Sequence, residues 1–230
     1  MRELNFYKDL VKKRTIANPS ILSANKGRFY DDIKKVIESG ADWVHIDIMD
    51  GYFVPNVTFG PWIVNVIRSI SKDIFIDVHL MVKDPFVYID YFGKTDCDLI
   101  SFHIESNRYK VEDYIKKIRE YGKYVGLVSN PDYRIEFSYK YLNDIDLYLI
   151  MSVFPGFGGQ KFIDDSLDNL RKLKDYKESQ NLDFLIEIDG GINQDTIELA
   201  VKNGAEVLVA GSYTFKGNYK QKIESLKVNR

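Results

Sequence analysis

Short apolar runs rich in β-branched residues alternate with longer amphipathic segments along almost the whole chain. Runs of this length and composition, many of them ending in polar or glycine-rich residues, are typical of buried strands. The runs predicted to be strands are Ile16–Leu22, Trp43–Ile48, Ile74–Leu80, Leu99–Phe102, Tyr124–Val128, Leu147–Met151, Phe184–Ile188 and Val207–Ala210.

The amphipathic segments between these runs are expected to be helices. Clear examples are Arg28–Ser39, Val111–Tyr121, Ser166–Glu178 and Gln194–Asn203, and Gly40 stands where the first of them should stop. Eight strands, each with room for a helix after it, predict an α/β protein with a single (β/α)8 TIM barrel, whose usual size is about 250 residues. An open eight-stranded sheet with helices on both faces is the alternative.

No linker, low-complexity tract or change of composition divides the chain, so the sequence predicts one barrel domain over residues 16–230. Residues 1–15 precede it as an N-terminal extension. Leu4, Tyr7, Leu10 and Val11 recur at helical spacing, so the extension is expected to be helical. Its expected role is to cap the bottom of the barrel or to pad a contact between subunits.

Three of the predicted strands carry polar residues on one face only. In the second strand, Val44, Ile46 and Ile48 share one face, whereas His45 and Asp47 share the other with period two. The apolar face of a barrel strand packs under the helices, so the polar face points into the lumen. The third and seventh strands repeat this pattern with Asp77, His79, Glu187 and Asp189.

Buried ionisable groups in one lumen are costly unless they are paired or bind a metal. A hydrogen-bonded network that only fixes the barrel interior is the simpler interpretation. Three strands that all direct polar residues into the lumen favour a metal site instead. His45, Asp47, His79 and Asp189 form the predicted ligand set. Imidazole nitrogen and carboxylate oxygen suit one divalent ion, with Zn²⁺ preferred and Fe²⁺, Mn²⁺ or Co²⁺ as alternatives.

The remaining inward polar residues are given supporting roles. Asp77 and Glu187 are expected either to orient the metal ligands or to be interior polar groups. His103, the last of the three histidines, is expected to be a core residue or to orient a ligand rather than to be one.

Glycines follow the last three predicted strands. Gly156, Gly158 and Gly159 lie after the sixth strand, Gly190–Gly191 after the seventh and Gly211–Ser212 after the eighth. Glycine lets backbone N–H groups approach a ligand closely, and the loops after strands seven and eight commonly bind phosphate in these barrels. The pattern therefore favours a phosphate monoester as substrate.

Composition narrows the class of protein. Lys plus Arg total 32 and Asp plus Glu total 34, so there is no basic excess to indicate a nucleic-acid partner. No apolar run approaches the ~20 residues that span a bilayer, and residues 1–14 lack the apolar stretch of a signal peptide. The single cysteine, Cys97, cannot form an internal disulfide, so a cytoplasmic location is expected.

Five motifs, in order along the chain, resemble those of the ribulose-phosphate 3-epimerase family. They are Pro19–Ala24, His45–Gly51, Asp77–Met81, Pro155–Gln160 and Glu187–Gly191, and the similarity runs from residue 18 to residue 215. The resemblance implies a barrel of the ribulose-phosphate-binding type that interconverts D-ribulose 5-phosphate and D-xylulose 5-phosphate in the pentose phosphate pathway. It also implies a homo-oligomer.

The residues fit such chemistry. Inversion of a carbon beside a ketone needs one group that removes a proton from one face and another that returns a proton to the opposite face. Asp47 and Asp189 can flank an enediolate in the lumen, and the resemblance implies that Asp47 accepts and Asp189 donates in one direction, with reversed roles in the other. A metal would act there as a Lewis acid, and His45 and His79 would complete its shell.

The resemblance also implies the substrate contacts. Ser20 is expected to bond the sugar end away from the phosphate. The cavity is expected to be lined by His79, Met49, Met81 and Met151, and the phosphate to be held by Gly156, Phe157, Gly158, Gly159, Gly190, Gly191, Gly211 and Ser212. The loop at residues 154–160 is expected to close as a lid, because exclusion of water protects an enediolate.

Departures from the family pattern leave the sugar open. Phe154 stands where the family usually has asparagine, and Ser129 stands where leucine is common. The alternative substrate is a hexulose 6-phosphate such as D-allulose 6-phosphate, epimerised at the same carbon.

Two further classes are disfavoured. Phosphosugar decarboxylases and aldolases use an Asp-x-Lys-x-x-Asp strand, and Asp77–Val82 lacks its lysine and second aspartate. A non-catalytic phosphosugar sensor would be free to lose a base, yet Asp47 and Asp189 are both present.

Overall fold

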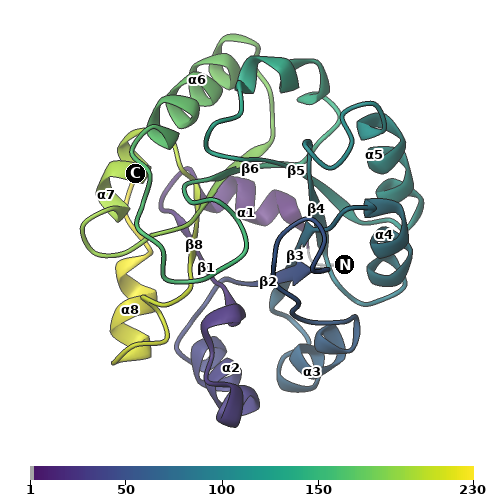
Figure 1. The fold of residues 1–230 in the computed structure, drawn as a ribbon. Coiled ribbons are helices and arrows are strands. Elements are labelled where there is room, and N and C mark those ends of the chain that lie inside the picture. The colour runs from purple at the N-terminus through teal and green to yellow at the C-terminus, as the bar shows by residue number, and fades with distance from the viewer. Residues whose placement is uncertain (1–2) are drawn as a thin grey trace.

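Eight parallel strands form a ring in the computed structural model, which describes residues 3–230 (Figure 1). The strands are β1 (Ile16–Pro19), β2 (Trp43–Met49), β3 (Phe75–Met81), β4 (Leu99–His103), β5 (Tyr124–Ser129), β6 (Leu147–Met151), β7 (Leu185–Asp189) and β8 (Val207–Ala210). Each pairs with its neighbour from β2 through to β8, and β8 pairs with β1. A parallel bridge between Ser20 and His45 joins β1 to β2 and nearly closes the ring, so the predicted TIM barrel is confirmed.

Seven helices follow the strands around the outside of the ring (Figure 1). They are α2 (Phe29–Glu38), α3 (Trp62–Ile70), α4 (Pro85–Gly93), α5 (Val111–Glu120), α6 (Ser166–Ser179), α7 (Ile197–Lys202) and α8 (Tyr219–Ser225). The expectation of a helix after every strand is wrong for β5, which is followed by a 3₁₀ segment at Ile135–Tyr141. Its β-branched, aromatic and serine residues are weak α-helix formers.

Two predicted boundaries are also wrong, although the other seven strands agree within one residue at each end. The first strand was expected to reach Leu22 but ends at Pro19, because the Ser20 hydroxyl accepts a hydrogen bond from the Leu22 N–H and starts a 3₁₀ turn at Ile21–Ser23. The helix predicted from Gln194 begins instead at Ile197. The Asn193 side chain and the Thr196 hydroxyl both donate to the Gly191 carbonyl and hold the preceding residues in a loop.

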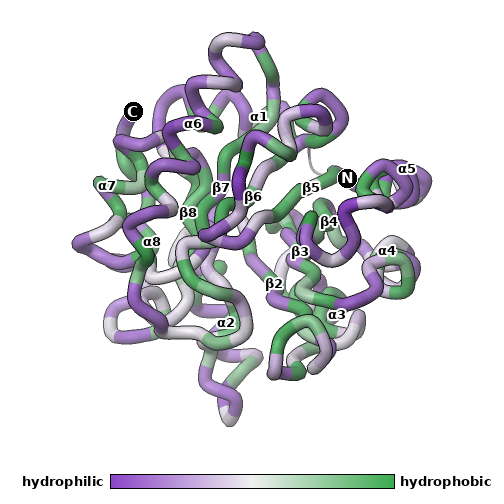
Figure 2. Tube along the Cα trace, turned by 45° about the horizontal axis from the view of Figure 1, so that its top comes forward, coloured by the Kyte–Doolittle hydropathy of each residue, from purple (hydrophilic) through white to green (hydrophobic). Residues whose placement is uncertain are grey.

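The alternation of side chains along the strands produces two apolar layers. Val44, Ile46 and Ile48 point outward and join a buried cluster with Ile33 and Val36 of α2. Figure 2 shows hydrophobic strands at the centre, surrounded by outer helices in which hydrophobic and hydrophilic residues alternate. The side chains predicted to point outward from β2 therefore do so, and the alternate polar side chains of that strand face the lumen.

A short helix closes the amino-terminal end of the barrel. Helix α1 (Leu4–Leu10) lies behind the ring in Figure 1, and its Leu4 is buried among the first residues of several strands. Trp43 and Phe75 stack there with ring centroids 4.3 Å apart, and Tyr7 packs edge-on against both. The bottom of the barrel is thus filled by aromatic side chains, which leaves the opposite end for a polar site. Residues 1–2 of the predicted extension lie outside the described residues.

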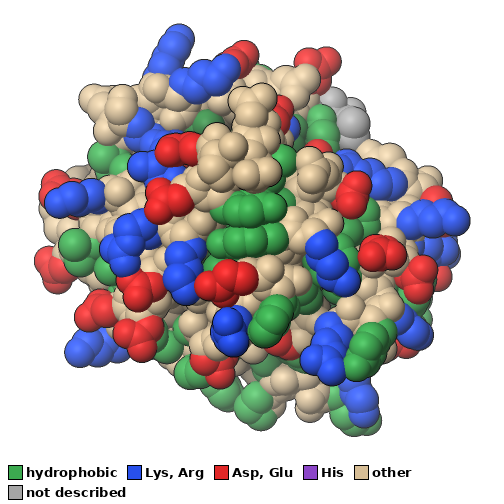
Figure 3. Space-filling view, turned by 90° about the horizontal axis from the view of Figure 1, so that it is seen from above, with side chains coloured by type: hydrophobic (Ala, Val, Ile, Leu, Met, Phe, Trp, Pro, Cys, Tyr) green, Lys and Arg blue, Asp and Glu red, His purple; other side chains and the backbone are tan. Residues whose placement is uncertain are grey.

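The outer surface is mixed in charge. On the face shown in Figure 3, Lys and Arg side chains are interspersed with Asp and Glu, and no histidine is visible. All three histidines are buried in the lumen. Among the helices of the described residues, none is long and apolar enough to cross a membrane.

Candidate active site and metal centre

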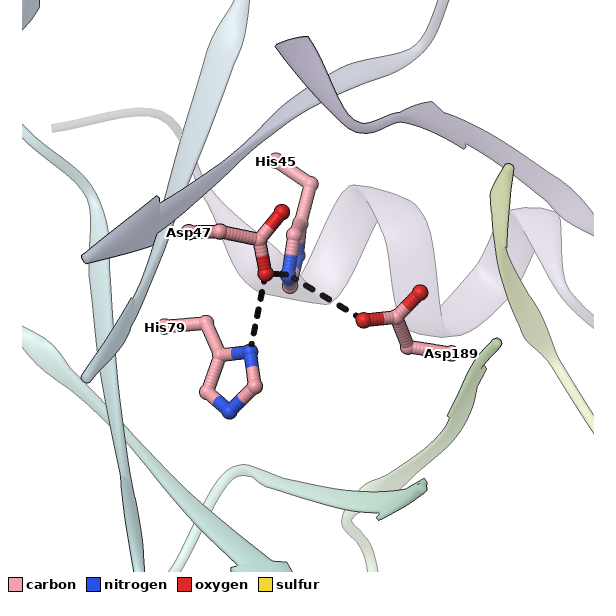
Figure 4. Close-up of side chains that lie close together, drawn as sticks. All are labelled: His45, Asp47, His79 and Asp189. Atoms are coloured by element: carbon pink, nitrogen blue, oxygen red, sulfur yellow. Dashed lines mark hydrogen bonds and ion pairs between the residues drawn. The ribbon is translucent and has the colours of Figure 1, made fainter. Parts of the chain in front are cut away.

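The four predicted metal ligands meet inside the barrel. Asp47 of β2 lies beside His79 of β3 in the parallel register, and Asp189 ends β7 across the lumen. The Asp47 Oδ1 atom is 3.4 Å from His45 Nε2 and 3.3 Å from His79 Nδ1, and His45 Nε2 is 4.0 Å from Asp189 Oδ2 (Figure 4). Residues from three strands therefore point toward one centre, as period-two alternation requires.

This arrangement fits a divalent metal ion. Each of the four residues offers one ligand atom, and these atoms all lie within 4.8 Å of one another. His45 Nε2 is buried and has no hydrogen-bond partner among the described residues, so its nitrogen is available to a metal. Two imidazole nitrogens and two carboxylate oxygens are a donor set that zinc and related ions accept.

A network of buried polar side chains holds the His45 ring in place through its Nδ1 atom. Its Nδ1 atom is 2.6 Å from Asp77 Oδ2. The Asn18 side chain donates to that same oxygen at 2.9 Å and to Glu187 Oε1 at 2.7 Å. A carboxylate on Nδ1 fixes the ring and leaves Nε2 directed at the metal position. Asn18 was not singled out from the sequence, although a polar residue within the apolar first strand is the signal that marks it.

His103 lies beside the cluster rather than within it. Its Nε2 atom is 2.9 Å from His79 Nε2, on the side of the His79 ring away from Asp47. The Phe53 ring packs against His103 with centroids 4.9 Å apart. This position agrees with the expectation that His103 contacts a ligand and is not one of the four.

The two aspartates have opposite electrostatic environments. Burial would raise the pKa of Asp47, but His45 and His79 outweigh it and hold that pKa well below its usual range. Burial, with the nearby Asp47 charge, raises the pKa of Asp189 to about 7. One carboxyl group is thus ionised at neutral pH while the other can carry a proton, as acid and base roles require.

The two histidines also differ. Burial would lower the pKa of His45, but Asp77 and Asp47 outweigh it and raise that pKa well above its usual value. Burial lowers the pKa of His79 to about 4, with the neighbouring His103 adding to the effect. His79 is therefore neutral at physiological pH, which is the form that can bind a metal.

A hydroxyl group also bonds to the cluster. The Ser20 Oγ atom donates to Asp47 Oδ2 at 2.5 Å, while Oδ1 of the same carboxylate faces the histidines. This contact depends on the early end of β1, because the 3₁₀ turn that begins after Ser20 directs its side chain toward the lumen. Ser20 therefore fixes the orientation of the Asp47 carboxylate.

A cavity of about 270 Å³ leads from the aspartates to the glycine-rich loops. It brings together most of the residues predicted to bind substrate: Ser20, Phe157, Gly158, Gly159, Gly190, Gly191, Gly211 and Ser212, together with Asp47 and Asp189. His79, Met49, Met81, Met151 and Gly156 are not among its lining residues. Met49 and Met81 instead pack with Val54, and Met151 packs in the inner core.

The first two residues of the loop after β7 must be glycines. Gly190 and Gly191 have φ angles of +121° and +62°. A Cβ atom on Gly190 would lie 2.6 Å from Val153 Cγ2, and one on Gly191 would lie 2.5 Å from the Phe162 nitrogen. Both the left-handed backbone and the close approach of neighbouring segments require glycine at these two positions.

The cavity also contains residues that the sequence analysis missed. Ser23, Asn193 and Lys216 line it, and an adjoining hollow is lined by Lys26 and Lys216 with no carboxylate among its described residues. Ser23 falls within the first of the quoted motifs, which could have indicated it. Nothing in the local pattern around Lys216 distinguishes it from other surface lysines.

The loop after β6 is held over this hollow by side-chain amides. Gln160 Nε2 donates to the carbonyls of Phe154 and Phe157 at 2.7 and 2.8 Å. Asn56, in the loop after β2, donates to the Gly156 carbonyl at 2.7 Å. The loop at residues 154–160 is therefore attached to the β2–α3 connection on the other side of the barrel mouth.

Comparison with known proteins gives this site a family. The profile of the ribulose-phosphate 3 epimerase family matches residues 16–215. Ribulose-phosphate 3-epimerase from a Synechocystis strain is 43% identical over 219 residues, covering 94% of this chain and 95% of that protein. The protein of the same name from Bacillus subtilis is 42% identical over 208 residues, covering 90% of this chain and 95% of that protein.

Solved structures with low sequence identity share the fold. A 3-keto-L-gulonate-6-phosphate decarboxylase from Vibrio cholerae aligns with a TM-score of 0.70 at 13% identity, over 93% of this chain and 95% of that one. A mutant tryptophan synthase α-subunit from Pyrococcus furiosus aligns with a TM-score of 0.66 at 15% identity, over 93% of this chain and 98% of that one. The fold is thus shared with other enzymes, whereas the full-length match at more than 40% identity is specific: this chain belongs to the ribulose-phosphate 3-epimerase family.

Proposed function

We propose that this protein is a metal-dependent isomerase that interconverts D-ribulose 5-phosphate and D-xylulose 5-phosphate by proton transfer at C3. The observation that carries the proposal is the pair of aspartates, one of low and one of raised pKa, that line a cavity together with several glycines. Family membership adds the substrate, since the relatives carry the name ribulose-phosphate 3-epimerase.

The ligand set would be His45, Asp47, His79 and Asp189. Zn²⁺ is the ion we favour, and Fe²⁺, Mn²⁺ or Co²⁺ also accept nitrogen and oxygen ligands. When bound, the ion would supply Lewis-acid stabilisation of negative charge on the sugar oxygens. Asp77 holds His45 through Nδ1, so that its Nε2 lone pair stays directed at the ion.

The two aspartates would move the protons. In one direction, the ionised Asp47 removes the C3 proton from one face of the sugar, which leaves an enediolate. Asp189, whose raised pKa allows it to hold a proton at neutral pH, then delivers that proton to the opposite face. The reverse reaction exchanges the two roles. Ser20 keeps the Asp47 carboxylate in one orientation through its 2.5 Å hydrogen bond.

The phosphate would lie at the glycine-rich end of the cavity. Gly158, Gly159, Gly211 and Ser212 line that end, where close backbone approach suits an anion. Lys216 adds a positive charge there, and the adjoining hollow that it lines with Gly158 and Ser212 contains no carboxylate among its described residues. A neutral sugar joined to a dianionic phosphate matches this separation of charge. Closure of the loop at residues 154–160 would exclude water during the reaction.

Isotope exchange provides the test. We expect protein incubated with D-ribulose 5-phosphate in D₂O to form D-xylulose 5-phosphate with deuterium at C3, as followed by proton NMR. A parallel incubation with D-allulose 6-phosphate measures substrate choice. Faster exchange with the six-carbon sugar would replace the proposed substrate by the hexulose phosphate, and no exchange with either sugar would contradict the epimerase proposal. The expected homo-oligomer can be checked on the same sample by light scattering.

A further inference from the structure

We propose that Asn56, in the loop between β2 and α3, is a positioning residue that holds the loop after β6 over the proposed phosphate site. Its Nδ2 atom donates to the Gly156 carbonyl at 2.7 Å, although β2 and β6 lie on opposite sides of the ring. Among the described residues, this is the only hydrogen bond between residues 154–160 and another loop. The inference rests on the proposed function for the ligand, a phosphate group, and not for the contact itself.

The loop after β6 has few other contacts that could fix its position. Gln160 Nε2 donates to the carbonyls of Phe154 and Phe157, so this side chain ties the loop to itself. The Ile163 N–H donates to the Ser152 carbonyl at 2.8 Å and closes the base of the loop. The Phe154 and Phe157 side chains are more than half exposed and add little packing. These bonds shape the loop, but they do not determine where it lies over the cavity.

Gly156 is the point at which the two loops meet. It is buried, and a Cβ atom placed on it would lie 3.5 Å from Val54 Cβ, so its backbone packs directly on a buried residue of the β2–α3 loop. The apolar contact and the Asn56 hydrogen bond therefore act on the same residue. Gly158 and Gly159, which line the cavity, follow closely in the chain, so a shift of Gly156 would move them.

The β2–α3 loop gives Asn56 a firm support. Asp50 Oδ1 accepts the N–H groups of Tyr52 and Phe53, each at 2.9 Å, and so fixes the start of the loop. Near its end, the Thr58 hydroxyl donates to the Asp47 carbonyl at 2.5 Å. The loop is thus tied to the strand that carries Asp47. Asn56 thereby sets the position of the phosphate-binding glycines relative to the strand of the proposed catalytic carboxylate.

Loss of the contact has a calculable effect. One neutral hydrogen bond typically shifts an equilibrium about 2- to 10-fold, so without it the displaced form of the loop should become about 2- to 10-fold more populated. A ligand that binds only the ordered form loses affinity as the population of that form falls. Removal of the Asn56 amide should therefore expose the loop and weaken phosphate binding, with little effect on the chemical step.

Two substitutions separate this contact from the turn to which Asn56 belongs. Asn56 Oδ1 accepts the Val57 N–H at 2.9 Å. Asn56→Asp keeps that acceptor and the size of the side chain, but it places an oxygen against the Gly156 carbonyl. Asn56→Ala removes both bonds and adds no charge near the phosphate. Asn203→Ala is the matched control, because Asn203 also donates its amide to a backbone carbonyl, that of Leu199, at 2.8 Å at the end of α7.

Limited digestion of the full chain with chymotrypsin, followed by mass spectrometry, measures the position of the loop without any ligand. When a segment opens and closes quickly, its cleavage rate follows the population of the open form. We expect cleavage after Phe157 to be about 2- to 10-fold faster in both Asn56 variants than in wild type or Asn203→Ala. Cleavage after the exposed Tyr109 is the internal reference, and cleavage after Tyr52 reports on the β2–α3 loop itself.

Binding is measured with inorganic phosphate by titration calorimetry and with D-ribulose 5-phosphate by steady-state kinetics. We expect Asn56→Ala to bind phosphate at least about twofold more weakly and to raise KM by a similar factor. Its kcat should stay within about a factor of two of wild type, because no reacting group has been removed.

Three results would overturn the inference. The first is unchanged cleavage after Phe157 in both Asn56 variants. The second is cleavage after Tyr52 in Asn56→Asp that accelerates as much as cleavage after Phe157, since Asn56 would then stabilise only its own loop. The third is an Asn56→Ala protein with faster cleavage after Phe157 but unchanged phosphate affinity and KM. Failure of the proposed function looks different, because wild type would then bind no phosphate and exchange no deuterium at C3, while the cleavage rates would still differ.

Discussion

Asp47 and Asp189 each direct a carboxylate oxygen into one cluster, where the two atoms lie within 4.8 Å of each other. They come from β2 and β7, which are not neighbours in the ring. The two groups reach the centre from different parts of the lumen wall, with His45 between them in Figure 4. In the proposed mechanism, the two groups would act as base and acid on different faces of one small substrate.

Replacement of either aspartate is expected to abolish turnover while the fold is kept. Asp47→Asn removes the base of one direction and Asp189→Asn removes its acid, and each such group contributes typically about 10²- to 10⁴-fold to a rate. We expect each variant to lose at least about 100-fold in kcat for epimerisation, measured in a coupled assay with circular dichroism as the check on folding.

Asp73→Asn, on an exposed position before β3, is the control and should be fully active. Wild-type turnover in either active-site variant would rule out the two-base mechanism. Loss in only one direction of the reaction by Asp47→Asn would also contradict it, since one carboxyl group serves both directions.

Metal affinity is expected to rise with pH. Asp77 and Asp47 raise the pKa of His45 well above its usual value, so its Nε2 atom must release a proton when a metal binds. His79, whose pKa is lowered to about 4, releases none at neutral pH. The metal is therefore expected to bind more tightly as the pH rises.

We expect the apparent Zn²⁺ affinity to increase at least about tenfold from pH 6 to pH 8, because each proton released changes the affinity by up to a factor of ten per pH unit. Chelator competition at several pH values measures this, with the buffer's own zinc binding subtracted. An affinity that is flat or falls over this range would show that the ligands are not protonated as described. Removal of metal by a chelator should abolish activity, and added Zn²⁺ should restore it.

Lys216 is expected to contribute to substrate capture. It lines both the cavity and the adjoining hollow where we propose that the phosphate binds, and it is exposed, so water and salt screen its charge. Lys216→Ala should raise KM about threefold with little change in kcat. An effect of this size matches the free energy that a single exposed charge usually contributes to an ionic interaction. The measurement is steady-state kinetics at low and high salt.

The exposed Lys202→Ala at the end of α7 serves as the control. In wild type, added salt should raise KM, and this dependence should be weaker in Lys216→Ala but unchanged in Lys202→Ala. If KM depended equally on salt in all three proteins, Lys216 would not contribute to substrate binding.

Gly191 is expected to tolerate alanine much less well than Gly122. Their φ angles are similar, +62° and +68°, so both substitutions force alanine into the left-handed region at a cost of about 1–2 kcal/mol. A Cβ on Gly122 would meet nothing within 4 Å, whereas one on Gly191 would press on the Phe162 backbone at 2.5 Å. We expect Gly191→Ala to lower the free energy of unfolding by about 1–3 kcal/mol more than Gly122→Ala.

Urea unfolding at constant m-value measures the difference. Equal losses in the two variants would mean that the loop after β7 shifts freely, and it would then not be a rigid wall of the proposed phosphate site. Gly191→Ala should also raise KM, because any shift moves the backbone that lines the cavity.

Much of the site could be predicted from the sequence for a simple reason. In a barrel strand, parity alone decides whether a side chain faces the lumen, so His45, Asp47 and His79 could be assigned to it without coordinates. The glycines of the β7 loop were equally visible, because glycine is the residue that most readily adopts a positive φ. Agreement of seven strands within one residue follows from the same period-two signal and from the apolar composition of the runs.

The early end of β1 and the 3₁₀ segment after β5 were not predicted, because each depends on a balance between weak local preferences and side-chain hydrogen bonds. Ser20 shows this clearly, since its hydroxyl both starts the turn and donates to Asp47. Lys216, Ser23 and Asn18 gain their roles only from neighbours that are distant in sequence. No local pattern records such proximity.

By itself, the sequence determined which side chains enter the lumen, because that follows from alternation along single strands. Tertiary structure alone decided how those side chains meet: which strands adjoin, how their registers align Asp47 with His79, and which nitrogen of each histidine faces a carboxylate. Distances between strands are set by hydrogen-bond register and by packing of the whole ring, and these are properties of the closed barrel rather than of any segment of it.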